Sequence, residues 1–507
     1  MLYSSKLFNY SKENGGRAII LFLLFLLAIY ELVSSGFSTF AIICFSPALI
    51  IVAYAIFRWK GAGILFLFAI NYFIPFKLIN WHLPVSLIDE AIELLLIAVA
   101  VIDIRQTPHF ERALNIMLFA LSIWFGLCFI EIFNDTCGLG INFGAWFSGA
   151  RIMALQLLWI ILIFSIYISS PKILMNYLRL WAVLSLFSAF WTWKMIHIGL
   201  TPEENAFLNG AGRSTHLLQA GTLIRYWSTF TDAANYGCNA AASATAFLIL
   251  SITSKIKIDR VFFFLTSAAV IWGMFQSGTR TAIFCLIFGA VVFLFLSKSV
   301  RILVPSAIVL GIFLIILIFT NIGNGNQQIR RMRSAFNKKD ASANVRDINK
   351  AAIAKYMKDA PWGIGIGIHS ENIPAWNKYK ILSGIPPDSE YVYIWVRTGP
   401  IGVGIFACCM IIMLAGASYI VLFRLKNKSL VGIGASLCSA FAAIQLGGYA
   451  NQVLYQYPNG LIFYGGLAIV YVLPYIEKEW DIYENERLTK QEEKKRLKLE
   501  KKLAERV

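Results

Sequence analysis

Long runs of apolar residues recur along almost the whole chain, and short polar connectors separate them. A membrane-spanning helix needs about 20 apolar residues, and by this length the pattern predicts about fourteen spans. We therefore expect an all-α fold, a polytopic bundle of transmembrane helices with one large polar loop that contains short helices. The expected spans lie at residues 18–35, 39–57, 62–79, 85–102, 113–133, 151–170, 173–199, 236–254, 261–276, 281–297, 302–320, 398–423, 429–449 and 459–476.

The composition agrees with a membrane protein. Of the 507 residues, 58% are hydrophobic and only 14% are charged, which excludes an ordinary soluble globular protein. The formal net charge of +17 does not indicate nucleic-acid binding, because most Lys and Arg lie between apolar runs, where they set topology. No small-residue cleavage site follows the first apolar run, so we interpret it as an uncleaved span.

Connectors that carry Lys and Arg alternate with connectors that carry almost none. Because Lys and Arg concentrate on the cytoplasmic side, this alternation puts both termini in the cytoplasm. Residues 200–235 and 321–397 then lie outside, which for a bacterial inner-membrane protein means the periplasm. The expected organisation is eleven spans with the smaller loop in 1–320, the large loop in 321–397, three spans in 398–476 and a charged cytoplasmic tail in 477–507.

The large loop is the one long polar segment of the chain, and it is basic. A positive surface beside a bilayer suits either an anionic ligand or anionic lipid headgroups. Within the loop, Ser342 is placed to cap a helix over Ala343–Asp359, and Pro361 enforces its end. Apolar residues recur in this helix at steps of three and four, which predicts one apolar face.

Three glycines follow this helix in the sequence WGIGIGIHS, at Gly363, Gly365 and Gly367. They lack the Lys-Ser/Thr of a phosphate loop and the strand context of a dinucleotide fold. We interpret the segment as a flexible turn that lets the backbone approach a ligand.

Cysteines, histidines and intramembrane acids give no sign of a metal centre. The eight cysteines and five histidines lack ligand spacing, so we predict no metal and no cofactor. Cys137 and Cys238 either pair on the outside or remain free thiols. Three acids, Asp89, Glu90 and Glu93, lie at the outer end of the fourth span. An ion pair with Lys77 or Arg151 explains them better than a functional role does.

Three arginines on the predicted outer side are the first candidates for chemistry. Arg225 precedes the eighth span, Arg280 joins the ninth and tenth spans in QSGTRTA, and Arg346 lies on the loop helix. A guanidinium stays charged and binds phosphate oxygens in a bidentate way, so these residues suit a lipid-linked diphosphate. Snorkelling at the membrane interface is the alternative explanation for each of them.

The motifs around these residues resemble a known family. The segments RYWSTFTDAANYG, SGTRTA, PWGIGIG and PPDSEYVYIWVRTGPIG resemble the O-antigen ligase and O-antigen polymerase (Wzy-like) superfamily of membrane glycosyltransferases. Ligases of that family carry in their large periplasmic loop a His, then Asn, Ser or Gln, nine residues, Gly, two residues and Gly. Ser389, Gly399 and Gly402 fit this spacing. The resemblance also implies that Arg280 and Arg346 bind the diphosphate.

The position of the family's His holds Asp388. A carboxylate can also act as a general base, so Asp388 would orient or deprotonate the acceptor. His369, the one histidine of the loop, and Glu390 are further candidates for contact with substrate, as is Ser389. The missing His tilts the interpretation from ligase toward polymerase.

The leading hypothesis is an inner-membrane glycosyltransferase that moves a glycan from undecaprenyl diphosphate to an acceptor hydroxyl on the periplasmic face. The acceptor is another lipid-linked saccharide if the protein is a polymerase, and a lipid A core if it is a ligase. A flippase for lipid-linked sugars is the rival from another class, but we find no repeat between the two halves of the chain of the kind that transporters show. Membrane lipids are expected partners, nucleic acid is not, and a role beside other envelope glycan-assembly proteins stays open.

Overall fold

The computed structural model describes residues 54–56, 58–75, 85–102, 109–218, 223–298, 300–322, 324–336, 341–369 and 372–504, together with a few positions between 22 and 51. The expected spans at 18–35 and 39–57 lie mostly outside the described residues, and Lys77 lies outside them altogether.

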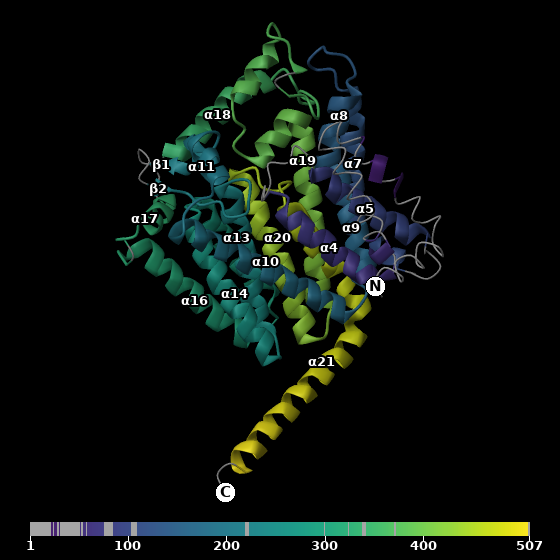
Figure 1. The fold of residues 1–507 in the computed structure, drawn as a ribbon. Helices are drawn as coiled ribbons and strands as arrows, with labels where there is room; N and C mark the ends of the chain where they lie inside the picture. Colours follow the sequence, from purple (N-terminus) through teal and green to yellow (C-terminus); the bar gives the residue numbers. More distant parts are fainter. Residues whose placement is uncertain are drawn as a thin grey trace, which may run out of the picture.

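Helices make up nearly all of the described chain (Figure 1). The two described strands, β1 (Leu217–Leu218) and β2 (Leu223–Ile224), pair antiparallel with Leu217 opposite Ile224. The helices are α4 (Lys60–Phe73), α5 (Val85–Ile102), α6 (Phe110–Ala113), α7 (Ile116–Ile130), α8 (Phe143–Ala150), α9 (Gln156–Tyr167), α10 (Pro171–His197), α11 (Pro202–Asn209), α12 (Arg213–His216), α13 (Ala233–Thr253), α14 (Lys257–Gln276), α15 (Arg280–Leu296), α16 (Val300–Phe319), α17 (Gln327–Arg333), α18 (Ala341–Met357), α19 (Glu390–Tyr419), α20 (Lys428–Ala450) and α21 (Gly465–Ala504). Short 3-10 or π segments are η1 (Glu131–Phe133), η2 (Arg151–Leu155), η4 (Ser334–Phe336), η6 (Lys378–Gly384), η7 (Ile420–Arg424) and η8 (Gly460–Tyr464).

The expectation of an all-α, multi-pass membrane protein is confirmed. Within the described residues, 8 helices are long and apolar enough to cross a membrane, and three shorter apolar helices accompany them. Every expected span from 62–79 onward coincides with one of the helices. The total of about fourteen spans remains a prediction.

Two helices form the centre of the bundle because their side chains are small. In α13 and α20, 83% and 89% of the most apolar stretch is buried. Small residues let helix backbones approach closely inside a membrane, where van der Waals packing drives association. Gly289 of α15 shows how close: a Cβ there would lie 2.9 Å from Thr245 of α13 and 3.2 Å from Ala443 of α20.

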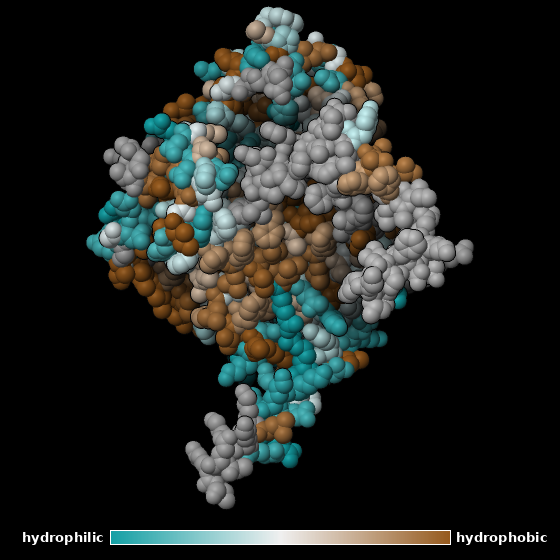
Figure 2. Space-filling view, in the orientation of Figure 1, coloured by the Kyte–Doolittle hydropathy of each residue, from teal (hydrophilic) through white to brown (hydrophobic). Residues whose placement is uncertain are grey.

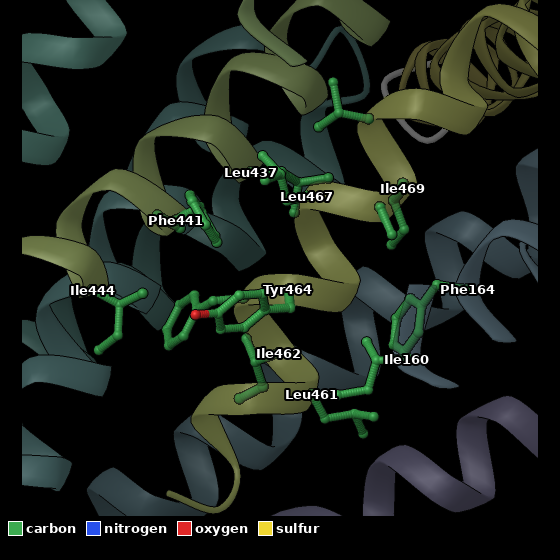
Figure 3. Packing of buried hydrophobic residues seen from close by; sticks show 14 of the residues in the cluster. Ile160, Phe164, Leu437, Phe441, Ile444, Leu461, Ile462, Tyr464, Leu467 and Ile469 are labelled. Atoms are coloured by element: carbon green, nitrogen blue, oxygen red, sulfur yellow. The ribbon is translucent and has the colours of Figure 1, made fainter. Parts of the chain in front are cut away.

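Larger apolar side chains fill the space around this centre. Figure 3 shows Leu437, Phe441 and Ile444 of α20 beside residues of η8 and α21, with Phe164 of α9 on the far side. The outer surface of the bundle is also apolar, and Figure 2 shows a hydrophobic region across its middle with hydrophilic residues toward both ends. This distribution fits a bilayer as solvent.

The two polar loops meet at one end of the bundle. In Figure 1, β1, β2, α11 and α18 lie at that end, and the C-terminal part of α21 projects from the opposite one. Gln328 of α17 donates from Nε2 to the carbonyl oxygen of Ile224 in β2 at 2.9 Å, which joins the loops directly. This arrangement agrees with the predicted placement of both loops on one side of the membrane; that this side is the periplasm stays a prediction.

The loop helix forms, with shifted bounds. It runs over Ala341–Met357, so Ser342 lies inside its first turn and the predicted cap at Ser342 was wrong. The helix ends before Pro361, as expected. Its apolar face is buried only in the C-terminal half, where Ile353 is 1% exposed while Ile348 is 66% exposed. The buried half packs on a second apolar cluster, formed by Cys137, Ile353, Met357, Ala360, Ile364, Ile368, Ile373, Tyr379, Leu382 and Val396.

The glycine turn after α18 contacts protein backbone, which corrects its interpretation as a flexible approach to a ligand. Gly363 (φ 77°) lies against the carbonyl group of Arg397, and Gly367 (φ 75°) lies against the carbonyl group of Ala145 in α8. A Cβ at either position would overlap these atoms. The glycines therefore clamp the loop between α8 and α19.

The tail belongs to α21, and its first part is docked on the bundle. In α21, Glu484 is 5% exposed and forms an ion pair with Lys255 at 2.7 Å. Arg487 forms an ion pair with Asp259 at 2.7 Å. The continuous helix carries the chain out of the bundle only beyond these contacts (Figure 1).

Among the described residues, ion pairing is confirmed for Glu90 alone of the three acids on α5. Glu90 pairs with Arg151 at 2.8 Å, and Asp89 accepts a hydrogen bond from Asn71 at 2.9 Å.

Cys137 and Cys238 are both free thiols, which settles the alternative left open by the sequence.

Candidate functional site

Asp388 lies in a constrained turn between η6 and α19. Its backbone adopts φ 49°, a left-handed conformation that costs energy outside glycine and that clusters at functional sites. Its Oδ2 accepts a hydrogen bond from Asn349 Nδ2 of α18 at 2.7 Å. The amide holds the carboxylate in one orientation while Oδ1 takes no part in that bond.

Ser389 begins α19 but does not cap it with its side chain. The Oγ donates instead to the carbonyl oxygen of Gly448 in α20 at 3.2 Å, and the residue is 7% exposed. This contact fixes the start of α19 against the end of α20. Ser389 therefore anchors the turn that presents Asp388.

Helix α18 presents a basic face to the same place. Arg346, Asn349 and Lys350 follow one another at helical spacing, so their side chains lie on one face. Arg346 donates from Nη2 to Asn451 Oδ1, just beyond α20, at 3.3 Å. The interaction links the loop helix to the membrane bundle.

A cavity of about 560 Å³ lies between these elements; we call it the α18–α19 cavity. Its polar wall comes from α18 and from the turn before α19, and its apolar wall from α19 and the end of α20. Both Arg346 and Asp388 line it, although 42 positions separate them in the chain. The lining residues are Arg346, Asp347, Lys350, Pro387, Asp388, Ser389, Tyr391, Val392, Trp395, Pro400, Val403, Tyr449 and Ala450.

Arg225 and Arg280 lie close enough to Arg346 for electrostatic repulsion, and Arg331 lies close enough to Arg225 and Arg280. We call these four residues the arginine cluster. Burial lowers the pKa of Arg331 to about 10, and repulsion by Arg225 and Arg280 adds to the effect. Burial also lowers the pKa of Arg225; the Asp232 carboxylate opposes this change, and Arg280 and Arg346 reinforce it. With a pKa of about 10, the Arg331 guanidinium is still charged at neutral pH.

The turn between α14 and α15 positions this cluster. Gly278 has φ 57°, and its carbonyl oxygen accepts a hydrogen bond from Arg331 Nε at 2.8 Å. The next residue, Thr279, accepts from Arg225 Nη2 at 3.0 Å and donates to the carbonyl oxygen of Ala233 at 2.6 Å. The SGTR segment thus fixes the start of α15, where Arg280 lies, against the start of α13.

The arginines bond to neutral oxygens. Arg225 donates to the carbonyl oxygens of Ser277 and Thr215 as well as to Thr279. Arg280 donates to Ser334 Oγ at 3.3 Å. Within the described part of the chain, no carboxylate lies within ion-pair distance of Arg225, Arg331 or Arg346. Among the described residues, these three arginines therefore have no ion-pair partner.

Two predicted residues lie elsewhere. Glu390 is 4% exposed and accepts a hydrogen bond from the backbone of Leu454, away from the α18–α19 cavity. His369 is exposed and lines a different cavity, described below. The structure therefore brings Arg346, Asp388 and Ser389 together, with Arg225 and Arg280 in the adjacent cluster, and leaves Glu390 and His369 outside.

The sequence reasoning missed Arg331, Asn349 and Asn451. Arg331 is one of several basic residues in QQIRRMR, and nothing in that run distinguishes it. Asn349 could have been found, because it lies one helical turn after Arg346 and a polar side chain there must share its face.

Part of the chain is similar to a known protein family. Residues 240–407 match the sequence model of the O-antigen ligase family. The chain is a multi-pass membrane protein with an O-antigen ligase domain. The match runs from α13 into α19 and includes Arg280, Arg331, Arg346 and Asp388, whereas Arg225 precedes it. The resemblance predicted from the motifs is thereby confirmed for this O-antigen ligase domain. No curated protein matches the chain.

Proposed function

We propose that this protein transfers a glycan from undecaprenyl diphosphate to an acceptor hydroxyl in the α18–α19 cavity, and that it polymerises repeat units. The observation that carries the proposal is that Arg346, a member of the arginine cluster, lines the same cavity as Asp388. An anion-binding group and a carboxylate base are the two parts that such a transfer needs. The membrane bundle supports a donor whose lipid tail stays in the bilayer.

The arginine cluster would bind the diphosphate and stabilise its charge as it leaves. Hydrogen bonds from a charged donor contribute about 1.5–3 kcal/mol each. They accelerate transfer when they strengthen as charge develops on the leaving group. An anion would also relieve the mutual repulsion among Arg225, Arg280, Arg331 and Arg346.

Asp388 would take the acceptor proton. The acceptor hydroxyl oxygen attacks the anomeric carbon, a new glycosidic C–O bond forms, and the bond from that carbon to the diphosphate breaks. The proton moves to the Asp388 carboxylate, and undecaprenyl diphosphate leaves with the electron pair. Asn349 holds Oδ2, so the proton would go to Oδ1.

The polymerase interpretation rests on Asp388 at the position where family ligases carry His. The test uses purified protein in lipid bilayers with an undecaprenyl-diphosphate-linked repeat unit as the only glycan, and the products are resolved by size. A growing ladder supports polymerisation. Transfer that begins only after lipid A core is added identifies a ligase. Transport of intact substrate across the bilayer without any transfer would exclude the enzyme.

Asp388 substitutions sharpen this test. Asp388→Asn keeps the size of the side chain but removes the base, and we expect the transfer rate to fall about 100-fold. Asp388→His restores a base of the kind that family ligases use, so we expect a rate within about tenfold of wild type. Asp359→Asn is the matched control, because Asp359 is an exposed acid of the same loop outside the cavity. Equal rates for Asp388→Asn and wild type would remove Asp388 from the mechanism.

A further inference from the structure

A second cavity lies on the other side of the turn that carries Asp388. It measures about 480 Å³, and Pro387, the residue before Asp388, lines both cavities. Part of its wall comes from the apolar cluster beneath α18, through Ile364, Ile368, Ile373, Leu382 and Val396. Its polar residues are His369, Tyr393, Arg397 and Gln452.

Arg397 is the unusual member of this wall. The residue is only 9% exposed, yet its Nε and Nη1 atoms have no hydrogen-bond partner among the described residues. These two atoms carry three N–H donors. The remaining nitrogen, Nη2, lies 3.4 Å from Nδ1 of His369, and the guanidinium lies over the Tyr393 ring at 5.1 Å. Among the described residues, no carboxylate forms an ion pair with Arg397.

A buried charge without a counterion is expensive, because the lost hydration is not replaced. The Tyr393 ring attracts the guanidinium by a cation–π contact but accepts no hydrogen bond from the free donors. Such a charge persists where an anion binds it during function. The free donors of Arg397 therefore indicate an anion site beside a cavity of saccharide size.

The backbone around Arg397 is held rigidly. Its carbonyl oxygen accepts a hydrogen bond from Gly365 at 3.1 Å, and the carbonyl of Val396 accepts one from Ile364 at 2.8 Å. Two residues later, Gly399 (φ 69°) kinks α19 and lies against the carbonyl of Pro361. The site is thus preorganised by the same glycine turn that clamps the loop, which reduces the cost of binding.

We propose that Arg397 binds an oxyanion on the acceptor saccharide, a carboxylate or a phosphate, and so orients the acceptor hydroxyl toward Asp388. This assignment rests on the proposed function for the identity of the acceptor. The donor diphosphate and the acceptor anion then bind to different arginines on the two sides of Asp388. Arg397 is a specificity-determining residue that touches the acceptor away from the reacting atoms.

The test is a binding measurement that needs no transfer. Three trisaccharides that differ in one substituent serve as probes: one has a glucuronate carboxylate, one a 6-phosphate and one a neutral glucose. Their affinities for the full-length protein in lipid nanodiscs are measured by calorimetry at 150 mM salt, where the Debye length is about 8 Å and long-range attraction is screened. We expect at least one acidic probe to bind at least tenfold more tightly than the neutral one.

Variants assign this preference to Arg397. Arg397→Gln is expected to abolish the tenfold preference, and Arg397→Lys to keep part of it. Arg213→Gln, at an exposed arginine of α12, is the matched control and should bind as wild type does. If Arg397→Gln does not fold, the wild-type comparison and competition by inorganic phosphate decide instead. Equal affinities for all three probes, or a preference that survives Arg397→Gln, would overturn the assignment.

The two acidic probes separate the two ligand sources, since preference for the carboxylate indicates a uronic acid and preference for the phosphate indicates a phosphorylated sugar. The transfer assay is kept apart. Arg397-dependent binding without any transfer by wild type would refute the proposed function and leave this site standing. Transfer by wild type in which acidic and neutral acceptors react equally would support the proposed function and overturn the assignment of Arg397.

Discussion

The arginine cluster at the loop end and the basic residues that contact α21 at the other end are held in opposite ways. At the end where α21 leaves, the Asp259 carboxylate lies 2.9 Å from Arg179 and 2.7 Å from Arg487, and Glu484 lies 2.7 Å from Lys255. At the loop end, Arg225, Arg331 and Arg346 donate to carbonyl, hydroxyl and amide oxygens. Both groups of basic side chains are held in place, but of the two only the residues beside α21 have carboxylate partners within the described chain.

This contrast separates charges that stabilise the fold from charges that serve a ligand. Neutralised pairs fix the tail on α14 and leave nothing for an anion to bind. Un-neutralised arginines held by neutral oxygens keep their position and their charge, which is the arrangement that an anionic substrate requires. The comparison predicts that substitutions at the two ends will have different consequences.

The largest expected effect is on transfer at the loop end. Arg346→Ala removes a charged donor from the α18–α19 cavity, and we expect the transfer rate to fall about 100-fold with little change in thermal stability. The rate is measured with the reconstituted protein and a lipid-linked repeat unit. Arg330→Ala, at an exposed arginine of α17, is the control. A stable Arg346→Ala protein with full activity would remove the functional half of the contrast.

A medium effect, on stability alone, is expected at the opposite end. Asp259→Asn leaves Arg179 and Arg487 without their shared carboxylate, and we expect a loss of about 2 kcal/mol, reduced by the partial exposure of both arginines. Thermal unfolding in detergent measures it, and transfer below the melting temperature should be unchanged. Glu493→Gln, on the exposed part of α21, is the comparison. Lost transfer in a folded Asp259→Asn protein would mean that this end also serves the reaction.

The smallest effect has the opposite sign for stability and for binding. Because the fold lowers the pKa of Arg331 to about 10, the charged guanidinium destabilises the folded state relative to the unfolded state at every pH below that value. Arg331→Gln should therefore stabilise the unliganded protein near pH 7.5, by about 1 kcal/mol once exposure to solvent is taken into account. The same change should weaken diphosphate binding severalfold.

Thermal unfolding with and without pyrophosphate checks both signs. Pyrophosphate should raise the melting temperature of wild type more than that of Arg331→Gln, and the rise in wild type should shrink as the pH passes 10. A lower melting temperature for unliganded Arg331→Gln would show that Arg331 serves the fold, as the arginines at the α21 end do.

Comparison of the predicted and observed sites shows where sequence reasoning stops. The motif spacing singled out Asp388, Ser389 and Gly399, which are close in sequence; the structure places Asp388 and Ser389 in the turn before α19 and Gly399 within α19. The same reasoning grouped Glu390 and His369 with them, although Glu390 points to the backbone of Leu454 and His369 lines the second cavity. Glu390 diverges from Asp388 and Ser389 because successive side chains at the start of a helix point in different directions.

The sequence by itself determined the environment and the elements. Apolar runs of membrane length require helices that satisfy their own backbone, the polar segment of 321–397 requires water, and the periodicity within it requires an amphipathic helix. Each of these follows from residues within about twenty positions of one another. The tertiary structure decided which side chains meet. Asn349 reaches Asp388 across 39 positions and Arg346 reaches Asn451 across 105. Such pairs depend on how the loop folds back on α19 and α20, which hydrophobic periodicity does not encode, because it records only which face of each helix is buried.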